Sequence, residues 1–125
     1  MQGIKSYKDL IVWQKAIDLA VEIYRISALF PRSELFGLTI QIRKAVNSIS
    51  LNTAEGHGRN TTKNYVAALY IAKGSLQEVE AALILAVRLG FIEESDCEKA
   101  NALILEEYKM FNALINSLEE KYNKN

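Results

Sequence analysis

The segment from Asn52 to Tyr65, NTAEGHGRNTTKNY, contains the single histidine of the chain between two glycines. A histidine base needs a partner that orients it, and nucleophilic catalysis by serine or cysteine needs both groups within hydrogen-bond reach. The single cysteine, Cys97, falls in a different predicted connection, at the other end of helices that would span ~33–42 Å. We therefore interpret His57 as a turn residue and expect a protein that is not an enzyme and has no catalytic residues.

A carboxylate-bridged metal pair inside a helical bundle is the other chemistry to consider. Such sites use Glu-x-x-His pairs whose side chains point inward from the helices. The sequence contains no Glu-x-x-His pair. We expect neither a metal site nor a cofactor.

The same histidine-containing segment offers a place for an anion. Arg59 and Lys63 flank the predicted start of a long helix, where free amide groups and the helix dipole favour a phosphate. The alternative is a plain turn, in which Thr62 caps the helix while Gly56 and Gly58 adopt positive φ angles. The spacing of a P-loop is missing, and the sequence leaves both interpretations open.

Apolar residues recur at steps of three and four along most of the chain and predict four helices, over residues 8–29, 33–55, 61–89 and 95–122. Ser33 and Ser95 are the predicted N-caps of the second and fourth helices, and Gly90 follows the third. Short connections make consecutive helices antiparallel neighbours. The predicted fold class is all-α, an antiparallel up-down-up-down four-helix bundle that forms a single domain over residues 1–125.

The first and third predicted helices carry apolar residues around more of their circumference than one bundle core requires. Exposed apolar patches of that size usually mark interfaces between proteins. Trp13, Tyr24 and Tyr108 lie on apolar stripes and indicate core or subunit contacts. We therefore expect several copies of the chain to associate into a homo-oligomer.

Equal numbers of basic and acidic residues, 15 of each, are unevenly distributed. Residues 1–75 carry ten Lys/Arg and five Asp/Glu, a net +5, and residues 76–125 carry the reverse, a net −5. The basic half favours binding of RNA or DNA, whereas the alternative is attraction between basic and acidic halves within or between bundles. The candidate nucleic-acid contacts are Lys15, Arg25, Arg43, Lys44, Arg59, Lys63 and Lys73.

Glu78 lies among apolar residues of the predicted third helix, which suggests a buried carboxylate. A buried acid needs a partner, and antiparallel packing about the preceding turn places Arg43 within one helical turn of it. We predict an Arg43–Glu78 pair that sets the register of two helices. Asn52, Glu55 and Ser75 complete the predicted structural polar network.

The N-terminal segment MQGIKSYKDL lacks the apolar stretch of a signal peptide, and no apolar run approaches the ~20 residues of a membrane span. One cysteine cannot form an internal disulfide, which is typical of proteins in a reducing compartment. Cys97 is predicted to pack rather than to react. We expect a cytoplasmic protein with no membrane partner.

Four segments carry a resemblance to a known family: YKDLIVWQKA (7–16), GLTIQIRKA (37–45), NTAEGHGR (52–59) and YIAKGSLQEVE (70–80). In this order and spacing they resemble the four-helix bundle proteins called 23S rRNA-intervening sequence proteins, over residues 6–92. The resemblance implies a bacterial, cytoplasmic bundle that assembles into a ring, a homopentamer. It implies no catalytic set, and it places the polar signature of the family on Arg43, Asn52, Glu55, Gly56, Gly58, Arg59, Ser75 and Glu78.

The accessory protein of diversity-generating retroelements, a pentameric barrel that binds nucleic acid and a reverse transcriptase, is similar to this family. The sequence and the resemblance together predict a non-enzymatic, homo-oligomeric bundle that binds structured RNA or DNA through a basic surface. The alternative is a protein-interaction scaffold without a nucleic-acid role, whose apolar surfaces serve self-association and a protein partner.

Overall fold

The structure, a computed structural model, describes residues 3–123, and every regular element in that range is helical. The four long helices are α1 (Ile11–Ser27), α2 (Leu38–His57), α3 (Thr62–Arg88) and α4 (Glu98–Asn123). Three short 3-10 helices precede α1, α2 and α4: η1 (Tyr7–Asp9), η2 (Arg32–Glu34) and η3 (Glu94–Cys97). The predicted all-α four-helix bundle is confirmed, and residues 1, 2, 124 and 125 of the predicted domain lie outside the described range.

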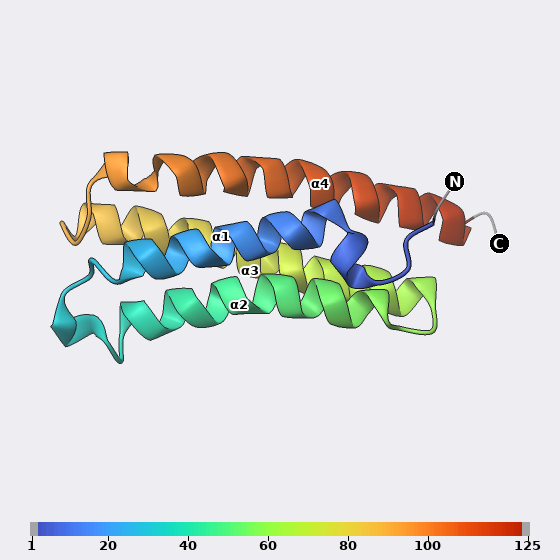
Figure 1. Ribbon diagram of the computed structural model, residues 1–125, viewed down its shortest axis with the longest axis horizontal. Coiled ribbons are helices and arrows are strands. Elements are labelled where there is room, and N and C mark those ends of the chain that lie inside the picture. Colours follow the sequence, from blue (N-terminus) through green and yellow to red (C-terminus); the bar gives the residue numbers. More distant parts are fainter. Residues whose placement is uncertain (1–2, 124–125) are drawn as a thin grey trace.

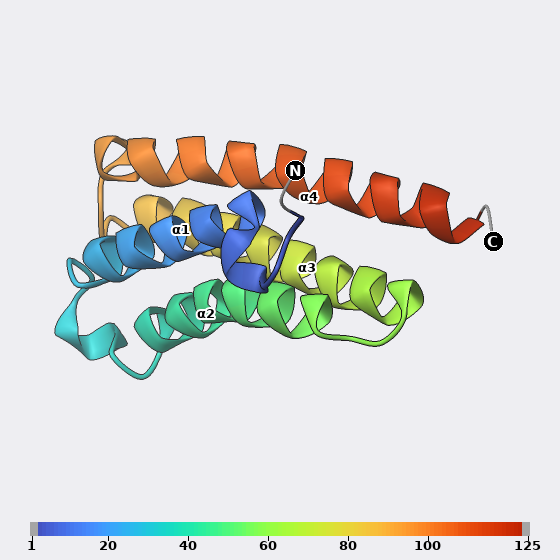
Figure 2. The same cartoon turned by 45° about the vertical axis from the view of Figure 1, so that its right-hand side comes forward.

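The helices pack around a common axis in chain order, because α1 contacts α2 and α4 while α3 also contacts α2 and α4. α1 and α3 therefore lie on one diagonal of the bundle (Figures 1 and 2). Contacts between α1 and α2 show that these helices are antiparallel: Tyr24 meets Asn47, whereas Ser27, further along α1, meets Arg43, which is earlier on α2.

One stripe of each helix faces the common axis and forms the core. Spacings of three and four residues place these side chains on one side of a helix, so that burying them turns the rest of the circumference outward. No helix within residues 3–123 has the length and the apolarity needed to cross a membrane. The largest fully buried apolar side chains include Leu19, Ile23, Ile42, Ile49, Leu69, Leu76, Ile104 and Phe111.

The starts of α1 and α2 differ from the sequence-based prediction. A capping box between Ser6 and Asp9 closes the turn of η1, and the extended backbone of Leu10 separates it from α1. Ser33 is not the N-cap of α2. Instead, the carboxylate of Glu34 accepts a hydrogen bond from the amide of Leu38 at 3.1 Å, and the helix begins there.

The connection between α2 and α3 corrects the interpretation of two glycines. Gly56 lies within α2 and Gly58 has a φ of −83°, so neither uses the positive φ predicted for it. A Cβ at Gly56 would lie 2.7 Å from the Cβ of Ala68, so glycine is needed there for the close approach of α2 and α3. Gly90 lies after the end of α3, as predicted, and has a positive φ of 79°.

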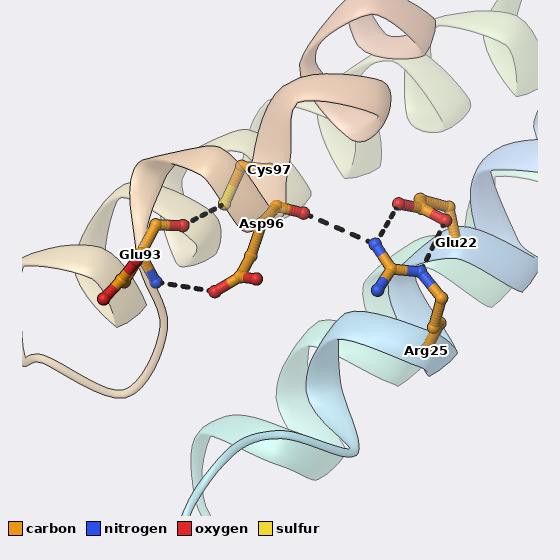
Figure 3. Close-up of polar contacts among 5 residues, drawn as sticks. All are labelled: Glu22, Arg25, Glu93, Asp96 and Cys97. Carbon is orange, nitrogen blue, oxygen red and sulfur yellow. Dashed lines mark hydrogen bonds and ion pairs between the residues drawn. The ribbon is translucent and has the colours of Figure 1, made fainter.

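Carboxylates also set the start of the last helical segment, where Ser95 was the predicted N-cap. The amide of Glu93 donates to the carboxylate of Asp96 at 2.8 Å, and the two residues form a capping box around η3 (Figure 3). α4 begins at Glu98, directly after this turn. The predicted serine cap is wrong because two acidic neighbours satisfy the free amides instead.

Candidate assembly and nucleic-acid interface

Large apolar side chains on the outer surface of α1 and α2 form what we call the α1–α2 face. Val21 is 68% exposed and lies on the same stripe of α1 as Tyr24. The Tyr24 hydroxyl accepts a hydrogen bond from the Asn47 amide of α2 at 2.9 Å, which joins the outer stripes of the two helices. The α1–α2 face consists of the exposed residues Ile17, Val21, Tyr24, Ile40 and Leu51.

The outer surface of α3 forms a second apolar surface, the α3 face. Between its large side chains lie Ala67, Gly74 and Ala81, three exposed small residues at spacings of seven. A Cβ added at Gly74 would meet nothing within 4 Å, so the surface is open at its centre. The α3 face consists of the exposed residues Tyr70, Ile71, Ile84 and Leu85 together with these small residues.

The two faces point away from each other because α1 and α3 lie on one diagonal of the bundle. Each face presents apolar side chains to solvent in the isolated chain. Contiguous exposed apolar surface on two sides of a small domain is typical of interaction sites. These faces match the sequence-based expectation that α1 and α3 carry more apolar surface than one core buries.

Three of the seven predicted nucleic-acid contacts, Lys15, Arg25 and Arg59, form ion pairs with acidic side chains of the same chain. Lys15 of α1 lies 3.5 Å from a carboxylate oxygen of Glu106 on α4. Arg59, at the turn before α3, forms an ion pair and a hydrogen bond with Glu55, four residues earlier. These partners reduce the positive charge that either residue offers to a phosphate.

Arg25, a third predicted contact, is bound to the buried carboxylate of Glu22. Its Nε and Nη2 donate to the two carboxylate oxygens of Glu22 at 2.9 and 2.5 Å, and Nη2 also reaches the backbone oxygen of Asp96 at 3.5 Å (Figure 3). The hydrogen bond from Arg25 is the main reason that the pKa of Glu22 is lowered from its usual value, although burial opposes it. Arg25 therefore connects α1 to the start of the last helix.

The other predicted contacts lie on different parts of the bundle. The guanidinium of Arg43 lies 4.8 Å from the centre of the Tyr24 ring, and its Nε donates to the Ser27 hydroxyl at 2.8 Å. Lys44 on α2 and Lys63 at the start of α3 are exposed. Lys73 on α3 is half-buried. Lys15 reaches α4, Arg25 reaches η3 and Arg43 of α2 reaches α1, while Lys63 and Lys73 lie on α3, so the seven residues do not gather into one patch.

The turn before α3 is closed by its own side chains. The Thr61 hydroxyl, rather than that of Thr62, caps α3 by accepting from the Asn64 amide at 3.1 Å. His57 is half-buried, and its ring meets the Tyr65 ring edge-on at a centroid distance of 5.8 Å. These contacts support the interpretation of this segment as a capped turn.

The predicted structural polar network is only partly formed. Asn52 donates to the backbone oxygen and the hydroxyl of Ser48, both at 2.8 Å. The Ser75 hydroxyl of α3 donates to the same Ser48 hydroxyl at 2.8 Å. Ser48, which the sequence reading missed, therefore joins the predicted residues and links α2 to α3.

The predicted burial of Glu78 and its pairing with Arg43 are wrong. Glu78 is exposed, and Arg43 turns toward α1 instead of α3. The apolar neighbours that suggested burial, Ile71 and Leu85, are themselves exposed members of the α3 face. This stripe of α3 is apolar, as predicted, but it faces the outer surface instead of the core.

Two other glutamates are buried, and the sequence reading did not single them out. Glu22 is 5% exposed and Glu107 is 0% exposed. Glu107 follows Ile104 by three residues and precedes Phe111 by four, which places it on the core stripe of α4. This spacing was the signal that would have identified it.

A surface hollow of about 680 Å³ lies between the end of α3 and the start of α4. Leu83 and Val87 line one side, and Glu94 and Glu98 line the other. Cys97 also lines it, but burial and then the nearby acidic groups raise the pKa of its thiol, which disfavours the reactive thiolate. Within residues 3–123, no three His, Cys, Asp or Glu side chains are arranged to hold a metal ion.

The four helices and the two outward apolar faces place the protein among all-α four-helix bundles that expose apolar surface on the isolated chain. Residues 8–113 match the family described as 23S rRNA-intervening sequence protein. The chain therefore belongs to the 23S rRNA-intervening sequence protein family.

A solved structure from Bacteroides thetaiotaomicron, described as a protein with unknown function from the S23 ribosomal protein family, has the same fold. It aligns with a TM-score of 0.77 at 24% sequence identity and covers 84% of this chain and 98% of that chain. No curated protein matches the sequence.

Proposed function

We propose that the protein is a non-enzymatic, cytoplasmic bundle that associates into a closed ring of identical copies and presents basic residues to structured RNA or DNA. The observation that carries the proposal is the pair of apolar faces on opposite sides of the bundle. The resemblance to the family supplies five as the number of copies. The closed turn around His57 and the raised pKa of the Cys97 thiol support the absence of catalysis.

Two different faces on one chain favour a ring over a two-fold dimer. In a two-fold dimer each copy uses the same patch, which would leave the other face exposed. When the α1–α2 face of one copy contacts the α3 face of the next, both faces are covered, and the repeated contact closes into a ring where the rotation between copies adds up to a full turn. The small residues along the α3 face allow the neighbouring helix to approach closely.

Nucleic-acid binding would use the basic residues that have no acidic partner among the described contacts, namely Arg43, Lys44, Lys63 and Lys73. Repetition around a ring would multiply these modest charges. The ion pairs of Lys15, Arg25 and Arg59 instead favour the second candidate function, a scaffold that contacts only protein.

Sedimentation of the purified protein tests self-association. Five protomers of 14.1 kDa would sediment as a particle of about 70 kDa. Val21→Glu on the α1–α2 face and Leu85→Glu on the α3 face should each release protomers, because each places a charge in an apolar contact. Leu105→Glu is the matched control, since Leu105 on α4 is 57% exposed but belongs to neither face. A wild-type protein that stays a monomer at micromolar concentration overturns the proposal.

Binding of a structured RNA at several salt concentrations separates the two candidate functions. The logarithm of the binding constant should fall linearly with the logarithm of salt concentration, and each lost phosphate contact should reduce the slope by roughly 0.7–0.9. Lys44→Gln and Lys63→Gln should each reduce this slope. Lys15→Gln should not, because the Lys15 ammonium already pairs with Glu106. An assembled ring with no salt-dependent RNA binding would favour the protein scaffold.

A further inference from the structure

Glu107 is fully buried, and neither of its carboxylate oxygens has a hydrogen-bond partner. Ile104 and Phe111, one turn away on either side, are buried core residues, so the side chain enters the apolar interior from α4. An ionised carboxylate without a partner is strongly disfavoured in such surroundings, and the group keeps its proton instead. The closely packed bundle therefore contains Glu107 in its protonated form.

The charged groups around Glu107 come from α1 and from its own helix. Burial, followed by the charges of Glu106 and Asp18, raises the pKa of Glu107 to about 8, and Lys15 opposes this increase. The Lys15 ammonium is already paired with Glu106.

On the side of α4 that faces α3, no cation of the described residues is among the charges that shift the pKa of Glu107. There the carboxylate of Glu80 accepts from the Tyr108 hydroxyl at 3.1 Å, and burial and this bond raise the pKa of Tyr108 to about 12. At the η3 end, the Asp96 carboxylate is engaged by the amide of Glu93. The ionised form of Glu107 therefore has only the engaged Lys15 to draw on among the described residues.

The same contact between α1 and α4 contains a second buried carboxylate that is stabilised differently. Glu22 is bound by Arg25, which also reaches the backbone of Asp96. The charge of Glu22 is therefore paired with that of Arg25. At Glu107, by contrast, the closed arrangement depends on a proton.

We propose that Glu107 is a proton-dependent switch within the bundle: the protonated acid allows α4 to pack closely against α1, and release of the proton to solvent loosens this contact. The step moves a single proton and breaks no other bond. The switch concerns the interior of one chain and does not depend on the proposed ring or on RNA.

Hydrogen exchange of the intact protein between about pH 6 and about pH 10 tests this switch. After correction for the intrinsic pH dependence of exchange, α4 and α1 should exchange faster above a midpoint near 8. Fluorescence of Trp13, the single tryptophan, provides a second readout from the first turns of α1. Glu107→Gln, which mimics the neutral acid, should abolish the transition in both measurements.

Two variants at exposed or half-exposed positions test the assignment even if Glu107→Gln does not fold. Glu106→Gln removes a negative charge and frees Lys15, so the midpoint should move to lower pH. Lys15→Met removes the opposing cation, so the midpoint should move to higher pH. A transition that persists in Glu107→Gln, or a midpoint that does not shift in opposite directions in these variants, overturns the inference.

Discussion

At the scale of single residues, three glutamates show how burial and partners change the behaviour of one side chain. Glu78 is exposed on the outer surface of α3. Glu22 is buried but stays ionised because Arg25 donates hydrogen bonds to it. Glu107 is buried without such a donor, and burial raises its pKa to about 8. Glu78 needs no partner because it is exposed to solvent. Burial of Glu22 depends on its ion pair with Arg25, and burial of Glu107 depends on pH.

The free energy of unfolding should depend on pH through Glu107. Its folded pKa is about 8, above the ordinary value of 4.5, so the folded state binds the proton more tightly than the unfolded state. This contribution is fully present below about pH 4.5 and is lost as the pH rises through about 8, at up to roughly 1.4 kcal/mol per pH unit. Urea unfolding at a series of pH values measures this loss.

Glu107→Gln should remove this pH-dependent term, because the amide does not titrate. Glu78→Gln changes an exposed glutamate and should leave the wild-type slope unchanged. The linkage assignment fails if Glu107→Gln and the wild type lose stability equally between these pH values.

Gly56→Ala should destabilise the bundle by about 1–3 kcal/mol, because the added methyl group would lie 2.7 Å from Ala68 and push α2 away from α3. Gly58→Ala is the matched control in the same turn. A Cβ there would make an ordinary contact at 3.5 Å with the backbone of Glu55, so the change should be neutral or stabilising by up to ~1 kcal/mol. Equal unfolding midpoints for the two variants would argue against a close approach at Gly56.

At the scale of secondary-structure elements, the helix starts show where local sequence rules were insufficient. Serine was predicted to cap both α2 and the last helical segment. Glu34 caps α2 through the Leu38 amide, and Glu93 with Asp96 caps η3. These three carboxylates also place negative charge at the positive end of a helix dipole. The choice among neighbouring Ser, Asp and Glu residues depended on the path of the preceding loop.

Asp96→Ala should lower the free energy of unfolding by about 1 kcal/mol, because the Glu93 amide loses its acceptor at the start of the last helical segment. Ser95→Ala, one residue earlier, should change it by less than ~0.5 kcal/mol, since Ser95 is exposed and is not the cap. Chemical denaturation of both variants compares these values. A larger loss in Ser95→Ala would restore serine as the functional cap.

At the scale of the whole molecule, the apolar residues serve two purposes. One stripe of each helix closes the core of a single chain, and the remaining apolar surface of α1, α2 and α3 faces outward on opposite sides. α4 contributes a different property, because its contact with α1 contains the buried carboxylates. The outward faces are where we place contact between copies, and the interior acids are where we place sensitivity to pH.

Self-association should make thermal stability depend on protein concentration. Assembly stabilises the folded protomer by mass action, so Tm should fall by roughly 2–6 °C for each tenfold dilution through the dissociation range. Val21→Glu should remove this dependence, while Leu105→Glu should retain it. Calorimetry over a range of protein concentrations measures the effect, and a wild-type Tm that is independent of concentration would contradict it.

The sequence by itself determined the four helices, their order and the excess of apolar surface on α1 and α3, because the 3.6-residue period is recorded directly in residue spacing. It also placed Gly90 directly after the third helix. It named Tyr24 as a core or subunit-contact residue, and Tyr24 is exposed on the α1–α2 face. It left open whether the basic residues bind nucleic acid or attract acidic residues, and three of the seven candidates pair with acids of the same chain.

Only the tertiary structure decided which apolar stripe faces inward, and therefore that Glu107 is buried while Glu78 is exposed. It also decided that Arg43 turns to α1, that Gly56 allows two helices to touch, and that Ser48 joins Asn52 to Ser75. The physical reason is that period and propensity are properties of one helix. The direction in which a stripe points, and the partner that a charge meets, depend on the rotation of each helix against its neighbours.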